Sequence, residues 1–194
     1  MIEKLVANAF FLGQFLRSPG KIGSICPSGR FLTQALAQAA LEKTNGLQGL
    51  IVDLGAGSGV VSRELLKSGV APERILAVDI SGRFREIFRK HCVGLELHTG
   101  DARNLEDLIN EYNPALPLQA VISSLPLRVM PGRLVSEIMS ETRKVLRRRG
   151  GVLIQYTYAF WLHSALGPYG FMIEKRRFVP VNIPPALVEK YILQ

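Results

Sequence analysis

The segment Val52-Asp53-Leu54-Gly55-Ala56-Gly57-Ser58-Gly59 joins an apolar run at residues 50–54 to a helical pattern at residues 60–67. Glycine at alternate positions lets the backbone turn tightly and lets a ligand approach the main chain. The spacing is G-x-G-x-G, and Val60 stands where the dinucleotide fingerprint G-x-G-x-x-G needs its third glycine. We therefore expect this loop to bind a ligand that carries no pyrophosphate.

On the C-terminal side of this loop, apolar runs alternate with helical patterns. Further strands are predicted at residues 74–79, 95–99, 118–123 and 151–158, and helices at residues 60–67, 81–91, 105–111 and 132–146. This alternation predicts parallel strands joined by right-handed crossovers. Residues 171–179 and 186–193 predict an antiparallel hairpin at the sheet edge, with a proline-rich turn between them. The expected fold is α/β: a doubly wound, Rossmann-like sheet of seven strands, mostly parallel with an antiparallel C-terminal hairpin.

On the N-terminal side of the loop, the pattern is helical. Residues 1–17 place apolar side chains at three- and four-residue spacing, which predicts an amphipathic helix. Residues 21–29 are interpreted as a loop and residues 30–43 as a second helix. We therefore expect residues 1–45 to be a helical extension that lies on a membrane surface or covers the ligand, and residues 46–194 to be the α/β domain.

Composition limits the cellular setting and the partners. The 194-residue chain carries 24 basic and 16 acidic residues, a formal charge of +8, which indicates a polyanionic partner, either nucleic acid or an anionic membrane. Residues 150–173 contain no charged side chain, but their polar residues and glycines favour a buried strand, so no transmembrane span is expected. Cys26 and Cys92 indicate free thiols in a reducing cytoplasm. The scattered histidines predict no metal site.

Acidic residues stand at the ends of three successive predicted strands. Asp79 comes 20 residues after Gly59, where such folds hold ribose hydroxyls, and Asp101 is placed to accept the adenine amino group. Asp53 is placed to hold an ammonium group, directly or through water. Each acid alone could be a helix cap, but together they indicate S-adenosyl-L-methionine as the cofactor. The predicted cofactor-binding residues are Asp53, Gly55, Ala56, Gly57, Gly59, Asp79, Ile80, Asp101, Ala102 and Ser123.

The fourth predicted strand runs into Ser123-Ser124-Leu125-Pro126-Leu127. Ligands of open α/β sheets bind in the crevice beyond the carboxyl ends of the strands, so this loop borders the transferable methyl group. It resembles the loop of amino-group methyltransferases, in which Asn or Asp precedes a Pro-aromatic pair. Leu127 offers no aromatic face on which a base could stack, which favours a non-planar amine. A plain proline-containing turn is the alternative interpretation.

Four further segments resemble one family. Ile25-Cys26-Pro27-Ser28, the Ser123–Leu127 loop, Gln155-Tyr156-Thr157-Tyr158 and the tail at residues 177–186 (RFVPVNIPPA) are similar to the short, soluble bacterial phospholipid N-methyltransferases. The chain departs from that family at Ser124, where glycine is commoner, and at Cys26. The resemblance implies a class I methyltransferase that transfers three methyl groups from adenosylmethionine to phosphatidylethanolamine, ending in phosphatidylcholine.

The resemblance and the chemistry together suggest roles for the remaining residues. The expected catalytic residues are Ser124, Leu125, Pro126 and Tyr156. The expected substrate-binding residues are Pro27, Ser28, Tyr158 and Arg177. Tyr156 and Tyr158 offer aromatic faces to a quaternary ammonium product, although they could equally be core residues. Arg177 is the expected partner of the headgroup phosphate.

The lipid interpretation implies a cytoplasmic protein associated peripherally with an anionic membrane, and the amphipathic helix at residues 1–17 is suited to that contact. An RNA adenine N6-methyltransferase is one alternative, because residues 128–149 are strongly basic. Leu127 and the absence of an appended RNA-binding domain make a nucleic-acid partner unlikely. A membrane-surface protein that only binds adenosylmethionine is the other alternative. The sequence selects neither the proton acceptor nor the oligomeric state.

Overall fold

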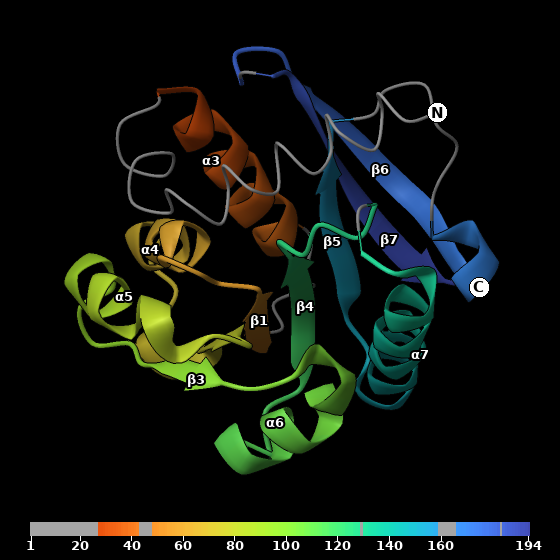
Figure 1. Cartoon of the computed structure of the whole chain (residues 1–194), viewed down its shortest axis with the longest axis horizontal. Coiled ribbons are helices and arrows are strands. Elements are labelled where there is room, and N and C mark those ends of the chain that lie inside the picture. Colours follow the sequence, from red (N-terminus) through yellow and green to blue (C-terminus); the bar gives the residue numbers. More distant parts are fainter. Residues whose placement is uncertain (1–26, 43–47, 129, 159–165, 183) are drawn as a thin grey trace.

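In the computed structural model, residues 27–42, 48–128, 130–158, 166–182 and 184–194 are described. Seven strands form one sheet in the order β3-β2-β1-β4-β5-β7-β6, with helices on both faces (Figure 1). The strands are β1 (Leu50–Leu54), β2 (Ile75–Asp79), β3 (Leu97–Thr99), β4 (Leu118–Ser123), β5 (Val152–Thr157), β6 (Phe171–Val179) and β7 (Ala186–Leu193). The helices are α3 (Pro27–Leu41), α4 (Val60–Lys67), α5 (Arg85–His91), α6 (Leu105–Tyr112) and α7 (Gly132–Arg149), with 3₁₀ turns η1 (Pro72–Arg74), η2 (Gly82–Phe84), η3 (Ala102–Asn104) and η4 (Gly167–Tyr169).

The strand directions confirm the predicted doubly wound fold with an antiparallel edge. Strand β1 pairs in parallel with β2 and β4, β2 pairs with β3, and β4 pairs with β5. Strand β7 is antiparallel to both β5 and β6. Every residue of β1 and β4 is buried, as expected of central strands covered on both faces. The carboxyl ends of the five parallel strands and of β6 therefore lie along one edge of the sheet.

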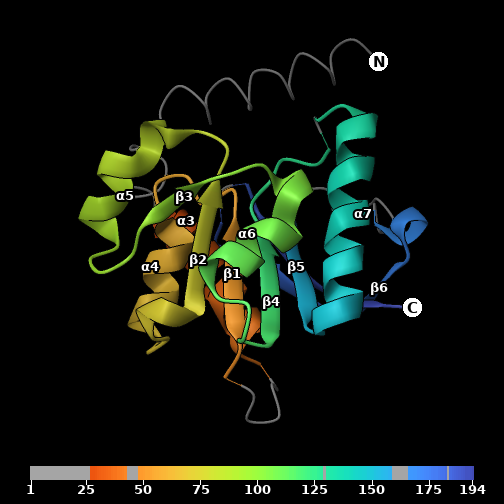
Figure 2. The same cartoon turned by 90° about the horizontal axis from the view of Figure 1, so that it is seen from below.

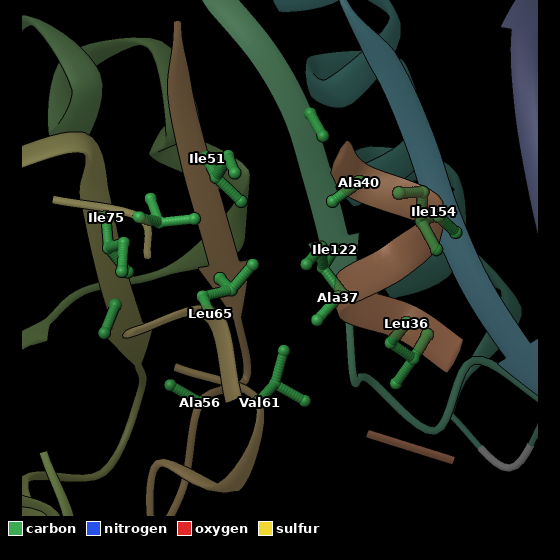
Figure 3. Packing of buried hydrophobic residues seen from close by; sticks show 14 of the residues in the cluster. Leu36, Ala37, Ala40, Ile51, Ala56, Val61, Leu65, Ile75, Ile122 and Ile154 are labelled. Carbon is green, nitrogen blue, oxygen red and sulfur yellow. The ribbon is translucent and has the colours of Figure 1, made fainter. Parts of the chain in front are cut away.

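Two apolar layers hold the helices to the sheet. On one face, α3, α4 and α5 contribute Leu36, Leu65 and Phe88 to a cluster with Ile51 and Ile122 of the central strands. Figure 3 shows side chains of α3 and α4 meeting the residues of β1, β4 and β5 in this layer. On the other face, α6 and α7 pack against the opposite sides of the same strands through a second cluster (Figure 2). Burial on this scale is the main stabilising contribution to such a fold.

Several element boundaries differ from the predictions. Helix α3 begins at Pro27, so the predicted loop at residues 21–29 is wrong for residues 27–29. Proline is tolerated in the first turn of a helix because its missing N–H would have no partner there. Strand β3 begins at Leu97 rather than residue 95, and α7 continues to Arg149 rather than residue 146. The predicted helix at residues 81–91 divides into η2 and α5. The predicted helix at residues 1–17 and Cys26 lie outside the described residues, and the division at residue 45 stays a prediction.

Helix α3 covers part of the sheet on the β5 side. Its residues Leu32, Ala37 and Ala40 are buried. Its C-terminal end is tied to the edge hairpin, since Lys175 Nζ lies 2.7 Å from Glu42 Oε2. Within the described residues, no helix has the length and apolar character that crossing a bilayer requires.

Candidate functional site

The glycine loop between β1 and α4 owes its shape to positive backbone angles. Gly55, Gly57 and Gly59 have φ of 79°, 51° and 81°. The amides of Gly55 and Ala56 donate to the carbonyl of Val78 at 2.8 and 2.9 Å, which fastens the loop to β2. A Cβ added at Gly57 would meet no atom closer than 4.0 Å, so that side of the loop is open to a ligand.

Gly59 has a different reason to be glycine. A Cβ there would lie 2.6 Å from Cys92 Sγ and 2.8 Å from a ring carbon of Phe88. Cys92 is a buried free thiol, and burial raises its pKa to about 12. Gly59 therefore lets α5 pack closely under the loop, and it does not line the cavity described below.

Asp53 lies beneath the loop rather than in its open side. Its side chain is fully buried, and Oδ2 accepts hydrogen bonds from the Ser62 amide at 3.0 Å and the Ser62 hydroxyl at 2.6 Å. Burial raises the pKa of Asp53 to about 6 despite these bonds. Its Oδ1 is buried and has no hydrogen-bond partner in the described part of the chain. Asp53 thus links α4 to β1 through its two hydrogen bonds with Ser62. Its Oδ1 remains without a partner among the described residues.

Asp79 ends β2 and holds the loop from the other side. Its Oδ2 accepts from the Gly57 amide at 2.9 Å, and its Oδ1 accepts from the Ser81 amide at 2.8 Å. Ile80 follows it with 73% of its surface exposed. Both residues line the cavity, as their predicted cofactor roles require.

Asp101 caps the short η3 turn and is paired with an arginine that the sequence analysis did not select. Its carboxylate accepts from the Arg103 amide at 2.9 Å and from the Arg103 guanidinium at 2.7 to 3.1 Å. These hydrogen bonds hold the pKa of Asp101 below its ordinary value. Arg103 also reaches Glu137 of α7 at 3.2 Å. In the sequence, the spacing of two residues between Asp101 and Arg103 could have indicated that these two side chains pair.

These elements surround a cavity of about 430 Å³ at the carboxyl edge of the sheet, within the size range of small-molecule sites. Twelve predicted site residues line it: Gly55, Ala56, Gly57, Asp79, Ile80, Asp101, Ala102, Ser124, Leu125, Pro126, Tyr156 and Tyr158. Asp53, Gly59, Ser123 and Arg177 do not. The backbone of Pro27 and Ser28 forms the first turn of α3, and their side chains lie outside the described part of the chain.

The loop after β4 is anchored on both sides. The Ser124 amide donates to the carbonyl of Leu54 at 2.8 Å, and Gln155 Nε2 donates to the carbonyl of Leu125 at 3.1 Å. Ser123 is fully buried, and its hydroxyl accepts weakly from the Leu125 amide at 3.4 Å. The loop is therefore a rigid wall of the cavity, and Ser123 supports it from behind rather than touching a ligand.

Tyr156 and Tyr158 form an aromatic corner at the end of β5. Their ring centroids are 5.5 Å apart and the rings are inclined by 71°. Burial raises the pKa of both phenols, so both stay neutral at physiological pH. A neutral phenol is a poor proton acceptor, so the ring face of Tyr156 is the feature it offers to a ligand.

Arg177 does not line the cavity, and its role as the partner of a headgroup phosphate stays a prediction. It sits on β6, and its guanidinium donates to Gln38 Oε1 of α3. Gly29, Leu32, Thr33 and Leu36 of α3 line the cavity instead, together with Arg83, Phe84 and Arg103. The helical pattern predicted α3, but no local signal showed which of its turns faces the site.

Comparisons with known proteins agree with this geometry. A family model described as a methyltransferase domain matches residues 51–150. The fold is similar to a 1,6-didemethyltoxoflavin N1-methyltransferase from Burkholderia thailandensis (13% identity, TM-score 0.63, covering 99% of this chain and 89% of that one). It is also similar to a magnesium protoporphyrin IX methyltransferase from Synechocystis PCC 6803 (15% identity, TM-score 0.60, covering 86% and 80%). A TehB-like methyltransferase from Corynebacterium glutamicum aligns over 97% of this chain and 99% of its own (12% identity, TM-score 0.60). No curated protein matches the sequence.

Proposed function

The chain belongs to the family of methyltransferase domains, and from that premise we propose that it methylates the amino headgroup of a membrane phospholipid, phosphatidylethanolamine. S-adenosyl-L-methionine is the cofactor, as in the class I methyltransferases that share the fold. Two alternatives have the same cofactor: methylation of RNA adenine, and binding of the cofactor without turnover.

Three features of the cavity support this cofactor: its open glycine loop and two carboxylates in its wall. The open side of Gly57 accepts the close approach of a ligand, and the carboxylates of Asp79 and Asp101 stand where ribose and adenine donors would meet them. When bound, the cofactor supplies an electrophilic methyl group on a positively charged sulfur.

The observation that carries the proposal is the composition of the remaining cavity wall. The same cavity that the glycine loop borders is also lined by Leu125, Pro126 and the two tyrosines Tyr156 and Tyr158. Aromatic faces attract a quaternary ammonium, and that attraction is stronger where water is excluded. The protein's contribution to the reaction is chiefly the positioning of the amine, which alone can account for a large part of a rate acceleration.

The surface around the cavity favours a lipid over a soluble amine. Large apolar side chains are exposed at the same edge of the sheet as the cavity: Phe31, Ile80, Tyr158, Phe178 and Val181. Ile80 and Tyr158 line the cavity itself, and Phe31 and Val181 are the chain neighbours of lining residues. With a formal charge of +8, the chain would also be attracted to anionic lipid. Apolar exposure beside a site is a mark of a binding surface.

The first experiment measures methyl incorporation from labelled adenosylmethionine. The acceptors are anionic vesicles with phosphatidylethanolamine, the same vesicles without it, and ribosomal RNA. The proposal expects label only in the first. Label in RNA would favour the RNA alternative, and binding of S-adenosylhomocysteine without incorporation into any acceptor would favour the binding-only alternative.

A matched pair of variants tests the apolar surface. Phe31→Ser with Val181→Ser removes two exposed side chains beside the cavity. Val93→Ser with Met172→Ser removes two exposed apolar side chains after α5 and at the start of β6, on the opposite edge of the sheet. The first pair should lower vesicle sedimentation and lipid methylation several-fold and leave S-adenosylhomocysteine binding unchanged. Equal effects of the two pairs would contradict a docking surface at the cavity.

A further inference from the structure

A chain of ion pairs runs from the surface of α7 to the adenine side of the cavity. Arg133 Nε lies 3.0 Å from Glu137 Oε1, Glu137 Oε2 lies 3.2 Å from Arg103 Nη1, and Arg103 Nη2 lies 2.7 Å from Asp101 Oδ2. The two inner members line the cavity, and the two outer members do not. These ion pairs therefore connect helix α7 to the carboxylate of Asp101, the predicted partner of the adenine base.

Arg103 leaves Asp101 with little unused acceptor capacity. An ionised carboxylate offers about four acceptor positions. Three donors of Arg103 occupy it: the backbone amide on Oδ1, Nη2 on Oδ2, and Nε, which is shared between the two oxygens. About one position remains for a further donor. A purine amino group has the right character to fill it, whereas a purine carbonyl at the same position would face a carboxylate oxygen and be repelled.

We propose that Arg103 is a positioning residue that makes Asp101 selective for a 6-amino purine, and that Glu137 holds Arg103 in place for this task. The guanidinium fixes the plane of the Asp101 carboxylate through paired hydrogen bonds, which lysine cannot reproduce. It also keeps that carboxyl ionised, since its hydrogen bonds lower the Asp101 pKa. The inference rests on the adenosylmethionine site of the proposed function and is independent of the methyl acceptor.

The test compares two ligands by calorimetry: S-adenosylhomocysteine and its inosine analogue, in which a carbonyl replaces the 6-amino group. The protein should prefer the adenine form by a large factor. Arg103→Met should weaken S-adenosylhomocysteine binding by about tenfold, the size expected for one charge-assisted hydrogen bond, and leave the inosine form unchanged. The selectivity ratio should fall by the same factor. Arg103→Lys should give an intermediate ratio, because it keeps the charge and loses the fork.

Two outer variants serve as graded controls. Glu137→Gln should lower the ratio by about threefold, since it removes one support of Arg103. Arg133→Met should leave it within about twofold, because this side chain is 92% exposed and, among the described residues, joins the network through Glu137. The pH dependence gives a separate readout. S-adenosylhomocysteine binding by Arg103→Met should begin to weaken at a higher pH on acidification than binding by the wild type, since Asp101 would regain a more ordinary pKa.

An unchanged selectivity ratio in Arg103→Met, or tighter binding of S-adenosylhomocysteine, would overturn the inference. The second result would mean that Arg103 competes with the base for Asp101. If the unaltered protein binds neither ligand, the adenosylmethionine site fails and the inference falls with it. Binding of both ligands with equal affinity would refute the selectivity alone and leave the cofactor site standing.

Discussion

Asp53 and Asp101 are the same residue type near the ends of two parallel strands, β1 and β3, and the structure uses them in opposite ways. Asp53 is fully buried under the glycine loop, accepts from Ser62, and has its pKa raised by burial to about 6. Asp101 keeps 25% of its side chain exposed at the cavity, accepts from Arg103, and has its pKa lowered. The buried residues under the glycine loop, Asp53 and Gly59, form its floor and fix its shape. The partly exposed Asp101 and Arg103 form the adenine side of the cavity and serve recognition.

The difference follows from what surrounds each carboxylate. Removal from water penalises the charged form of Asp53 more than the two Ser62 hydrogen bonds favour it. Near the surface, Asp101 keeps its hydration and gains a cation. We therefore expect changes on the floor to act mainly on folding, and changes on the adenine side to act mainly on binding.

The largest expected effect is that of Gly59→Ala on the floor. The added Cβ would combine a left-handed backbone with contacts of 2.6 Å to Cys92 and 2.8 Å to Phe88. We expect it to lower the free energy of unfolding by about 3–4 kcal/mol, from backbone strain and overpacking together. Gly69→Ala is the matched control, because Gly69 has a similar φ of 85° and no atom within 4 Å of an added Cβ. It should cost only about 1–2 kcal/mol, as urea denaturation would measure; equal losses would refute the crowding argument.

The Asp53→Asn substitution is expected to have an intermediate effect, on the way the free energy of unfolding changes with pH. With a folded pKa of about 6 against an ordinary value of 3.8, the native state binds the proton more tightly than the unfolded chain. Asp53 should therefore lower the stability of the wild type by about 2 kcal/mol as pH rises from 4.5 to 7.5. Denaturation of Asp53→Asn should lack this part of the slope. A slope equal to that of the wild type would mean that Asp53 titrates normally and is not buried as described.

The smallest effect on folding is expected from Asp101→Asn on the adenine side. Exposed ion pairs contribute about 0–1 kcal/mol, so the melting temperature should hardly change. Binding of S-adenosylhomocysteine should nevertheless weaken by about tenfold, because an amide cannot accept at both of its heavy atoms. If Asp101→Asn instead unfolds the protein and Asp53→Asn affects only binding, the contrast between floor and adenine side is reversed.

Local sequence signals predicted the strand-forming segments and the glycine loop. Their order implied the parallel sheet, because alternating apolar strands and helices can bury their faces in few other ways. The same signals could not show which of the acidic residues at the strand ends line the cavity. Asp53 and Asp79 both sit at strand ends in the sequence, yet only Asp79 lines the cavity. Which side of a strand end faces the cavity depends on neighbouring strands that come later in the chain.

Two arginines, Arg177 and Arg103, show more clearly which contacts the sequence could not predict. Arg177 was predicted to bind the phosphate of the substrate, but it contacts Gln38, which is 139 residues away in the sequence. Arg103 was not selected, and it lies in the cavity between Asp101 and Glu137. No spacing rule connects Arg177 with Gln38 or Arg103 with Glu137, because long side chains take their partners from the segments that packing brings within reach.

The sequence by itself determined the α/β architecture and the glycine loop of the adenosylmethionine site, since these depend on periodicity and on glycines that act within a few residues. The tertiary structure alone decided three further features. It made the first turns of α3 a wall of the cavity, turned Asp53 into a buried brace, and joined Arg103 to both Asp101 and Glu137. The physical reason is that burial and ion pairing depend on distances in space between segments that are far apart in the chain.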